Sequence, residues 1–159
     1  MSFRYFEDFP AGETVELGSH RVTEAEIIAF AKEFDPQTFH TDPKAARETG
    51  FGELVASGWH TSAMFMRLLV DGLLKESSAI ASPGVDELRW RKPVRPGDTL
   101  SARATVFDAI PSHTRADRGL VRHDCTVTNQ KGEVVMTLRT LAFFARKPAR
   151  PLRGVEPPR

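Results

Sequence analysis

Two pairs of side chains in this sequence have the types and spacing that acid–base chemistry requires. Asp35 and His40 are five positions apart, and Asp108 and His113 have the same separation. A carboxylate and an imidazole held together can bind a water molecule and move its proton, and such a positioned group contributes about 10²–10⁴ in rate. The alternative for each pair is a carboxylate that caps a turn and a histidine that hydrogen-bonds it.

The elements expected around the first pair set it apart. Thr23 and Glu26 form a capping-box pattern, which predicts the start of a short helix. Pro36 should end that helix, and Asp42 followed by Pro43 is typical of an N-cap and the first position of the next helix. The first pair is therefore expected in a polar loop, residues 34–42, between two short helices. The second pair falls between two strands.

The most apolar segment of the chain follows this loop. Residues 58–75 carry apolar side chains almost all round a helical projection, which predicts a buried helix. Arg67 and Asp71, together with the length of the segment, argue against a membrane span.

The remaining elements alternate with a period of two residues, which predicts strands. They are expected near residues 13–22, from about Gly84 through Trp90, at 100–106, at 121–128 and at roughly 133–145. Tight turns join the later strands, so the sheet should be antiparallel with one buried face. An antiparallel sheet curled around one apolar helix gives an α+β architecture, and its free edges favour dimerisation.

Length and charge suit a single domain with an appended tail. The chain has 159 residues and a formal net charge of +1, which gives no reason to expect nucleic acid. We predict one domain over residues 1–146 and a basic, proline-rich, solvated tail over 147–159. The lone cysteine, Cys125, cannot form an intrachain disulfide and is expected as a buried thiol on a strand. Without a signal-peptide core or a membrane span, a cytoplasmic protein is expected.

Several familiar sites are absent from the sequence. It has no phosphate-binding P-loop, no dinucleotide fingerprint and no Gly-x-Ser-x-Gly nucleophile elbow. One cysteine and no His-Glu-x-x-His motif make a zinc site unlikely, so no metal is expected.

Four segments in order resemble the MaoC-like dehydratases, which include the (R)-specific enoyl-CoA hydratases. They are Phe34-Asp-Pro-Gln-Thr-Phe-His-Thr-Asp-Pro-Lys-Ala-Ala46, Val55-Ala-Ser-Gly-Trp-His-Thr61, the strand and Pro-Gly-Asp turn over residues 88–100, and the hairpin over 129–134. The resemblance covers roughly residues 5–146. It implies a hot-dog fold, an antiparallel sheet wrapped around one long central helix.

The resemblance also implies catalytic roles. Asp35 would deprotonate or orient a water molecule, and His40 would hold the same water and help to pass its proton. The backbone amide of Gly58, at the start of the central helix, would be the oxyanion donor. The alternative for this glycine is that it merely permits close packing. The substrate-binding residues would be Gln37, Phe39, Ser57, Trp59 and His60.

The implied reaction is hydration of a trans-2-enoyl-CoA, or dehydration of a (3R)-3-hydroxyacyl-CoA. No cofactor is expected, because coenzyme A enters as part of the substrate. A thioester of acyl-carrier protein is an alternative substrate. The expected assembly is a homodimer or a dimer-based oligomer.

Departures from the family pattern concern the substrate more than the reaction. Gln37, Thr38 and Phe39 replace the family's Asn, Pro and aliphatic residue, and Met66 stands where the (R)-hydratases often have a serine. Two alternatives remain: a hot-dog acyl-CoA thioesterase, and a non-catalytic acyl-thioester-binding subunit of a dehydratase. Retention of both Asp35 and His40 argues against each.

Overall fold

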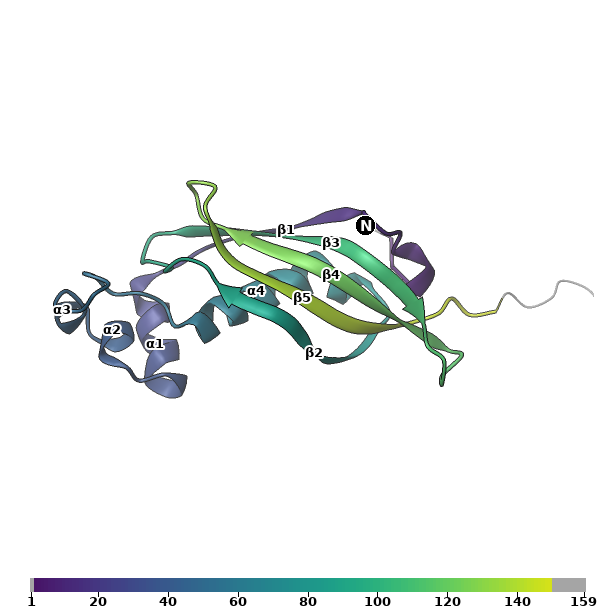
Figure 1. The fold of residues 1–159 in the computed structure, drawn as a ribbon, viewed down its shortest axis with the longest axis horizontal. Coiled ribbons are helices and arrows are strands. Elements are labelled where there is room, and N and C mark those ends of the chain that lie inside the picture. Colours follow the sequence, from purple (N-terminus) through teal and green to yellow (C-terminus); the bar gives the residue numbers. More distant parts are fainter. Residues whose placement is uncertain (1, 150–159) are drawn as a thin grey trace, which may run out of the picture.

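The computed structural model describes residues 2–149 and confirms the α+β prediction. One antiparallel sheet, with strand order β1-β3-β4-β5-β2, curves around a long helix, α4 (Figure 1). The strands are β1 (Thr14–Arg21), β2 (Ala79–Trp90), β3 (Thr99–Pro111), β4 (Arg118–Thr128) and β5 (Val134–Ala145). The helices are α1 (Glu24–Phe34), α2 (Thr38–Thr41), α3 (Pro43–Ala46) and α4 (Gly58–Gly72), with 3₁₀ turns η1 (Phe6–Asp8) and η2 (Leu74–Glu76).

The predicted helix starts are confirmed. The Thr23 hydroxyl accepts a hydrogen bond from the Glu26 amide at 3.2 Å, and the Glu26 carboxylate accepts one from the Thr23 amide at 3.1 Å. Asp42 accepts bonds from the amides of Lys44 and Ala45, and Pro43 follows it at the first helical position. The loop prediction for residues 34–42 was wrong in one respect. The segment contains the single helical turn α2, which carries His40.

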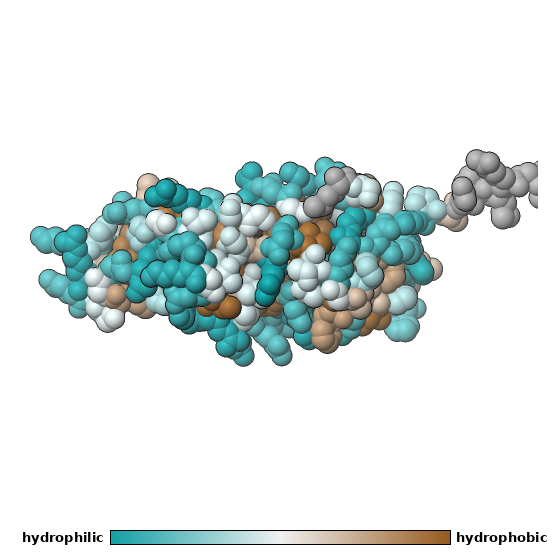
Figure 2. Space-filling view, turned by 90° about the horizontal axis from the view of Figure 1, so that it is seen from above, coloured by the Kyte–Doolittle hydropathy of each residue, from teal (hydrophilic) through white to brown (hydrophobic). Residues whose placement is uncertain are grey.

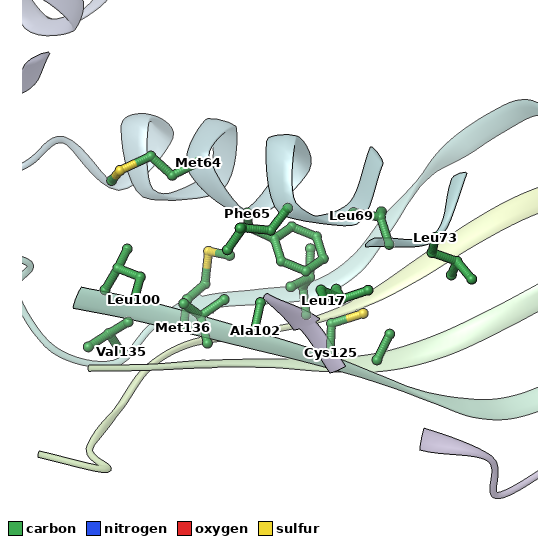
Figure 3. Packing of buried hydrophobic residues seen from close by; sticks show 14 of the residues in the cluster. Leu17, Met64, Phe65, Leu69, Leu73, Leu100, Ala102, Cys125, Val135 and Met136 are labelled. Carbon is green, nitrogen blue, oxygen red and sulfur yellow. The ribbon is translucent and has the colours of Figure 1, made fainter. Parts of the chain in front are cut away.

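The core lies between α4 and the concave face of the sheet. Figure 3 shows Phe65 and Leu69 of α4 above strand residues that include Leu100, Ala102 and Met136. Cys125 is buried on β4 as predicted, and burial raises the pKa of its thiol to about 12. Such a thiol stays protonated and unreactive.

The prediction that α4 is buried all round was wrong. Trp59 keeps 60% of its surface exposed and Met66 keeps 47%, whereas Phe65 is almost fully buried. The sheet covers only one side of the helix, because β2 is an edge strand with no further strand beyond it among residues 2–149. An apolar flank therefore remains open between α4 and β2.

Helices α1, α2 and α3 gather beyond one end of the sheet, at the end where α4 begins (Figure 1). This arrangement brings the Asp35–His40 segment to the N-terminal end of the central helix. The surface in Figure 2 is mostly hydrophilic, with small brown apolar areas among the polar atoms.

The predicted tail falls largely outside the described residues. Of residues 147–159, only 147–149 are described. The Lys147 amide donates to Glu7 at 3.0 Å, and its ammonium group bonds Asp8, so this start of the segment lies against η1. Among the described helices, none is both long enough and apolar enough to cross a membrane.

Candidate active site

Asp35 and His40 come together although they belong to different elements. Asp35 is the C-terminal cap of α1, and His40 lies in the turn of α2. The Nε2 atom of His40 is 3.4 Å from Oδ2 of Asp35, and both side chains are largely buried, with 8% and 17% of their surface exposed. The pair is thus a partly enclosed carboxylate and imidazole in contact.

Further hydrogen bonds fix the Asp35 carboxylate. The Ser57 hydroxyl donates to Oδ2 at 2.7 Å, and the Gln37 amide donates to Oδ1 at 2.7 Å. The Ser57 bond is the main cause that lowers the pKa of Asp35, with help from Gln37 and from the charge of His40 when it is protonated; burial opposes them. Asp35 is therefore held in its ionised form.

A backbone carbonyl fixes the tautomer of His40. Its Nδ1 atom lies 2.6 Å from the carbonyl oxygen of Val55, which can only accept a hydrogen bond, so Nδ1 carries the proton. In the neutral ring, Nε2 then presents its lone pair towards Asp35. The Val55 amide donates to the Phe39 carbonyl at 3.1 Å, which ties the same two segments together.

The N-terminus of α4 approaches this pair through Ser57. Ser57 is fully buried, caps the helix by accepting from the Trp59 amide at 3.3 Å, and donates to Asp35. Gly58 is the first helical residue, and its amide is among those that have no carbonyl partner within a helix. A Cβ at Gly58 would lie 2.4 Å from the Trp90 indole. Close packing therefore requires a glycine here.

These groups line a pocket of about 450 Å³. Of the residues that we predicted for the site, it is lined by Asp35, Gln37, Phe39, His40, Ser57, Gly58 and Trp59. Val55, Thr61, Val94 and Trp90 contribute further walls. The pocket thus combines an acid–base pair, a helix N-terminus and apolar side chains, the composition of a small-molecule site.

His60 is the exception among the predicted site residues. It faces α1 instead of the pocket, stacks on Phe30 with ring centroids 4.8 Å apart, and places Nε2 3.6 Å from Glu26. Burial is the main cause that lowers its pKa. The turn of α4 directs the His60 side chain towards α1, whereas Trp59 lines the pocket. The structure gives His60 a packing position between α1 and α4.

Sequence reasoning missed the Val55 carbonyl and the Trp90 indole. A carbonyl leaves no signal in the sequence, because every residue has one. Trp90 was assigned only to a strand, and its contact with Gly58 depends on where the end of β2 meets α4.

The basic side chains near the pocket divide into two groups. Lys92 pairs with Glu133 and Arg95 pairs with Glu53. Arg91 instead donates to the Thr137 hydroxyl at 3.1 Å. Within residues 2–149, no group of three or more His, Cys, Asp or Glu side chains is placed to hold a metal ion.

Comparison with known proteins agrees with this geometry. The model of the MaoC like domain matches residues 8–129. The (R)-specific enoyl-CoA hydratase of Rhodospirillum rubrum is 31% identical over 137 residues, covering 86% of this chain and 88% of the relative. The uncharacterized protein YdeM of Bacillus subtilis is 30% identical over 125 residues, covering 79% and 87%.

A solved structure agrees as well. The MaoC-like dehydratase from Rhodospirillum rubrum superposes with a TM-score of 0.84 at 44% identity, covering 92% of this chain and 99% of that one. The chain therefore belongs to the MaoC-like hydratase and dehydratase family, which acts on CoA thioesters, and it has that family's hot-dog fold. Several of its relatives are named hydratases or dehydratases, which places it with enzymes of the lyase kind.

Proposed function

We propose that this protein adds water to a trans-2-enoyl-CoA, or removes water from the matching (3R)-3-hydroxyacyl-CoA. The observation that carries the proposal is the contact of Asp35 Oδ2 with His40 Nε2 in the pocket. Hydrogen bonds hold both groups in place: Asp35 accepts one from Ser57, and His40 donates one to the Val55 carbonyl. With the proton on Nδ1, Nε2 of His40 and Oδ2 of Asp35 are two hydrogen-bond acceptors 3.4 Å apart. A molecule that donates two hydrogen bonds satisfies both, and water is such a molecule.

Held in this way, the water is positioned to attack carbon 3 of the enoyl group. As its oxygen bonds to that carbon, one of its protons passes to the Asp35–His40 pair. The pair returns a proton to carbon 2. Both additions come from one side of the substrate, so they are syn. The hydrogen bonds that lower the pKa of Asp35 make it a weak base, which favours His40 as the group that takes the proton.

The negative charge that develops on the thioester oxygen needs a donor placed beforehand. In our proposal the Gly58 amide supplies it, since it opens α4 at the pocket wall and the helix N-terminus favours an anion. The close contact with Trp90 explains why the residue is glycine.

The test is loss of the enoyl absorbance when the purified protein meets a panel of trans-2-enoyl-CoAs, with a free-thiol assay alongside. We expect absorbance loss without thiol release, and Asp35→Asn should abolish it. Thiol release would mean thioester hydrolysis instead. Retention of full activity by Asp35→Asn would remove the pair from the mechanism.

We propose further that two copies associate along β2 and α4. The outer edge of β2 has no strand partner among the described residues, and Val85 and Trp90 of β2 and Met66 of α4 are exposed beside it. Free strand edges and open apolar flanks favour association with another copy. Light scattering should report a dimer, and Val85→Lys combined with Met66→Lys should shift it towards monomer. A wild-type monomer would contradict this.

A further inference from the structure

The side chain of Ser62 lies between the Trp90 indole and the start of α4. Its hydroxyl accepts a hydrogen bond from Trp90 Nε1 at 3.2 Å and donates one to the Gly58 carbonyl at 3.1 Å. Trp90 belongs to β2, and its ring lies against Gly58, where an added Cβ would be 2.4 Å from the indole. Ser62 therefore joins the end of β2 to the first turn of the central helix.

The donor and acceptor roles in this contact are fixed. An indole N–H can only donate a hydrogen bond, so the Ser62 oxygen accepts from Trp90 and keeps its own hydrogen to donate. Two acceptors lie near that hydrogen, the Gly58 carbonyl oxygen at 3.1 Å and the Met136 sulfur at 3.5 Å. A thioether is a weak acceptor, so the hydrogen goes to the carbonyl.

The peptide group that contains this carbonyl continues the connection towards the catalytic pair. Its N–H is that of Trp59, which donates to the Ser57 hydroxyl at 3.3 Å. An amide can only donate, so Ser57 accepts from it and donates in turn to Asp35 Oδ2 at 2.7 Å. The hydrogen bonds thus form a chain that runs in one direction and passes, in order, through Trp90, Ser62, the 58–59 peptide, Ser57 and Asp35.

This chain of hydrogen bonds can act on the site in two ways. Bonds that point the same way along a chain polarise and strengthen one another, by about 10–30% per bond. The chain ends on a carboxylate, and hydrogen bonds to the ionised form of a carboxyl group favour that form. The chain also holds the first turn of α4 from outside the helix, because Trp90 comes from the sheet. Ser57 caps that turn and Gly58 opens it.

Resting on the proposed function, we propose that Ser62 and Trp90 are positioning residues for the hydration reaction. They hold the first turn of α4 so that Ser57 directs its hydroxyl to ionised Asp35 and the Gly58 amide faces the thioester oxygen. Ser62 does this without lining the Asp35–His40 pocket. The alternative is a purely local role, because serines within helices often bond the carbonyl of the preceding turn.

The first measurement tests the Trp90–Ser62 bond without reference to activity. The protein has two tryptophans, so a nitrogen–proton correlation spectrum shows two indole N–H signals, and Trp90→Phe identifies one of them by its loss. Ser62→Ala should shift that signal and speed its exchange with water, because the indole N–H loses its acceptor. A signal unchanged in position and in exchange rate would overturn the inference, whether or not the protein is active.

The second measurement compares enoyl-CoA hydration by the wild type, Ser62→Ala, Trp90→Phe and the double variant. Trp90→Phe keeps an aromatic ring beside Gly58 and removes only the indole donor. Each single variant should lower kcat by about 2- to 10-fold, the effect of one neutral hydrogen bond, and the double variant should lose no more than the larger single loss. Losses that multiply, or an unchanged kcat in Ser62→Ala, would overturn the inference.

The pH profile separates positioning from a purely local role. Ser62→Ala weakens the support for ionised Asp35, so the acid limb of kcat/KM should move to higher pH, by less than in Ser57→Ala. His40, the titratable group in contact with Asp35, is unchanged in these variants. The pH of the limb does not depend on how much of a preparation is folded. A limb that stays at its wild-type pH in Ser62→Ala would overturn the inference.

Two further variants are the controls. Ser62→Thr keeps the hydroxyl and should retain both kcat and the acid limb; a loss equal to that of Ser62→Ala would overturn the inference. Ser77→Ala removes a hydroxyl that donates to the Leu74 carbonyl at 2.8 Å, beyond the far end of α4, and should change neither quantity. Failure of the wild type to hydrate any enoyl-CoA would contradict the proposed function, whereas the indole signal tests the Trp90–Ser62 bond by itself.

Discussion

The Asp35–His40 and Asp108–His113 pairs have the same residue types and the same spacing, and the fold treats them in opposite ways. Asp35 and His40 meet in a pocket, where Ser57 hydrogen-bonds Asp35 and the Val55 carbonyl hydrogen-bonds His40. Asp108, on β3, instead binds Arg122 of β4, with Arg122 Nε donating to Oδ1 at 2.7 Å. His113 is exposed in the β3–β4 connection.

The difference follows from the backbone between the members of each pair. A strand rises about 3.3 Å per residue, so the β3 segment after Asp108 carries the chain away and leaves the carboxylate to a neighbour on the next strand. The turn of α2 after Asp35 brings the chain back, so that five positions of sequence become a contact. Spacing acquires a chemical meaning only through the local conformation.

The largest difference between the two pairs should appear when the histidine of each pair is replaced. We expect His40→Ala to lower kcat/KM by about 10²–10⁴, because the water loses both an acceptor and its proton carrier. His113→Ala is the matched control and should leave kcat/KM within about twofold, because its side chain is exposed and far from the chemistry. Equal losses in the two variants, measured by enoyl-CoA hydration, would remove the distinction between the pairs.

A second test concerns the glycine that opens α4. Gly58→Ala should reduce kcat by about 10²–10³, because the new methyl group and the Trp90 ring cannot occupy the same space and the amide is displaced. Overpacking should also cost about 1–3 kcal/mol of stability. The double variant Gly58→Ala with Trp90→Ala relieves the clash. Recovery of stability by the double variant, measured by denaturant unfolding, would confirm the steric cause.

A third test sharpens the role of Ser57 through pH. The Ser57 hydrogen bond is the main cause that holds the pKa of Asp35 down. Ser57→Ala should raise that pKa, so a larger fraction of Asp35 is protonated at a given low pH. The acid limb of the kcat/KM profile should therefore move to higher pH.

Thr23→Ala is the control for the capping contribution of Ser57. It removes the cap of α1 and should cost about 1 kcal/mol of stability without moving the acid limb. An unchanged limb in Ser57→Ala would show that Asp35 ionisation does not govern that side of the profile.

The smallest effect should come from the second carboxylate. Asp108→Asn removes the charge that binds Arg122 on the outer face of the sheet. The pair is only partly buried, and ion pairs near the surface contribute little, so we expect unchanged activity and a melting temperature within about 4 °C of wild type. A large loss of activity would give this pair a role that the structure does not suggest.

The helix starts were within reach of sequence reasoning because they are local. Thr23 with Glu26 and Asp42 with Pro43 each satisfy nearby amides, and the structure confirms both. The alternating pattern of β4 likewise predicted which side chains, such as Cys125, face the core. Asp35 and His40 lie in one short segment, and Gly58 was predicted from a second segment that resembles the family.

The sequence was a poorer guide where two distant segments meet. It counted Trp59 and His60 together as substrate-binding, but the helix turns His60 towards Phe30 and leaves Trp59 at the pocket. It treated α4 as buried all round, although the sheet covers only one side. Neither outcome follows from composition or periodicity, because each depends on which element packs against the helix.

By itself, then, the sequence determined the elements, the antiparallel sheet around one helix and the Asp35–His40 motif, since hydrophobic period and capping act over a few residues. Only the tertiary structure decided which carbonyl fixes His40, why position 58 is glycine, and that Ser62 joins Trp90 to the start of α4. Those contacts join residues far apart in the chain. Packing between elements brings them together, and no local pattern records it.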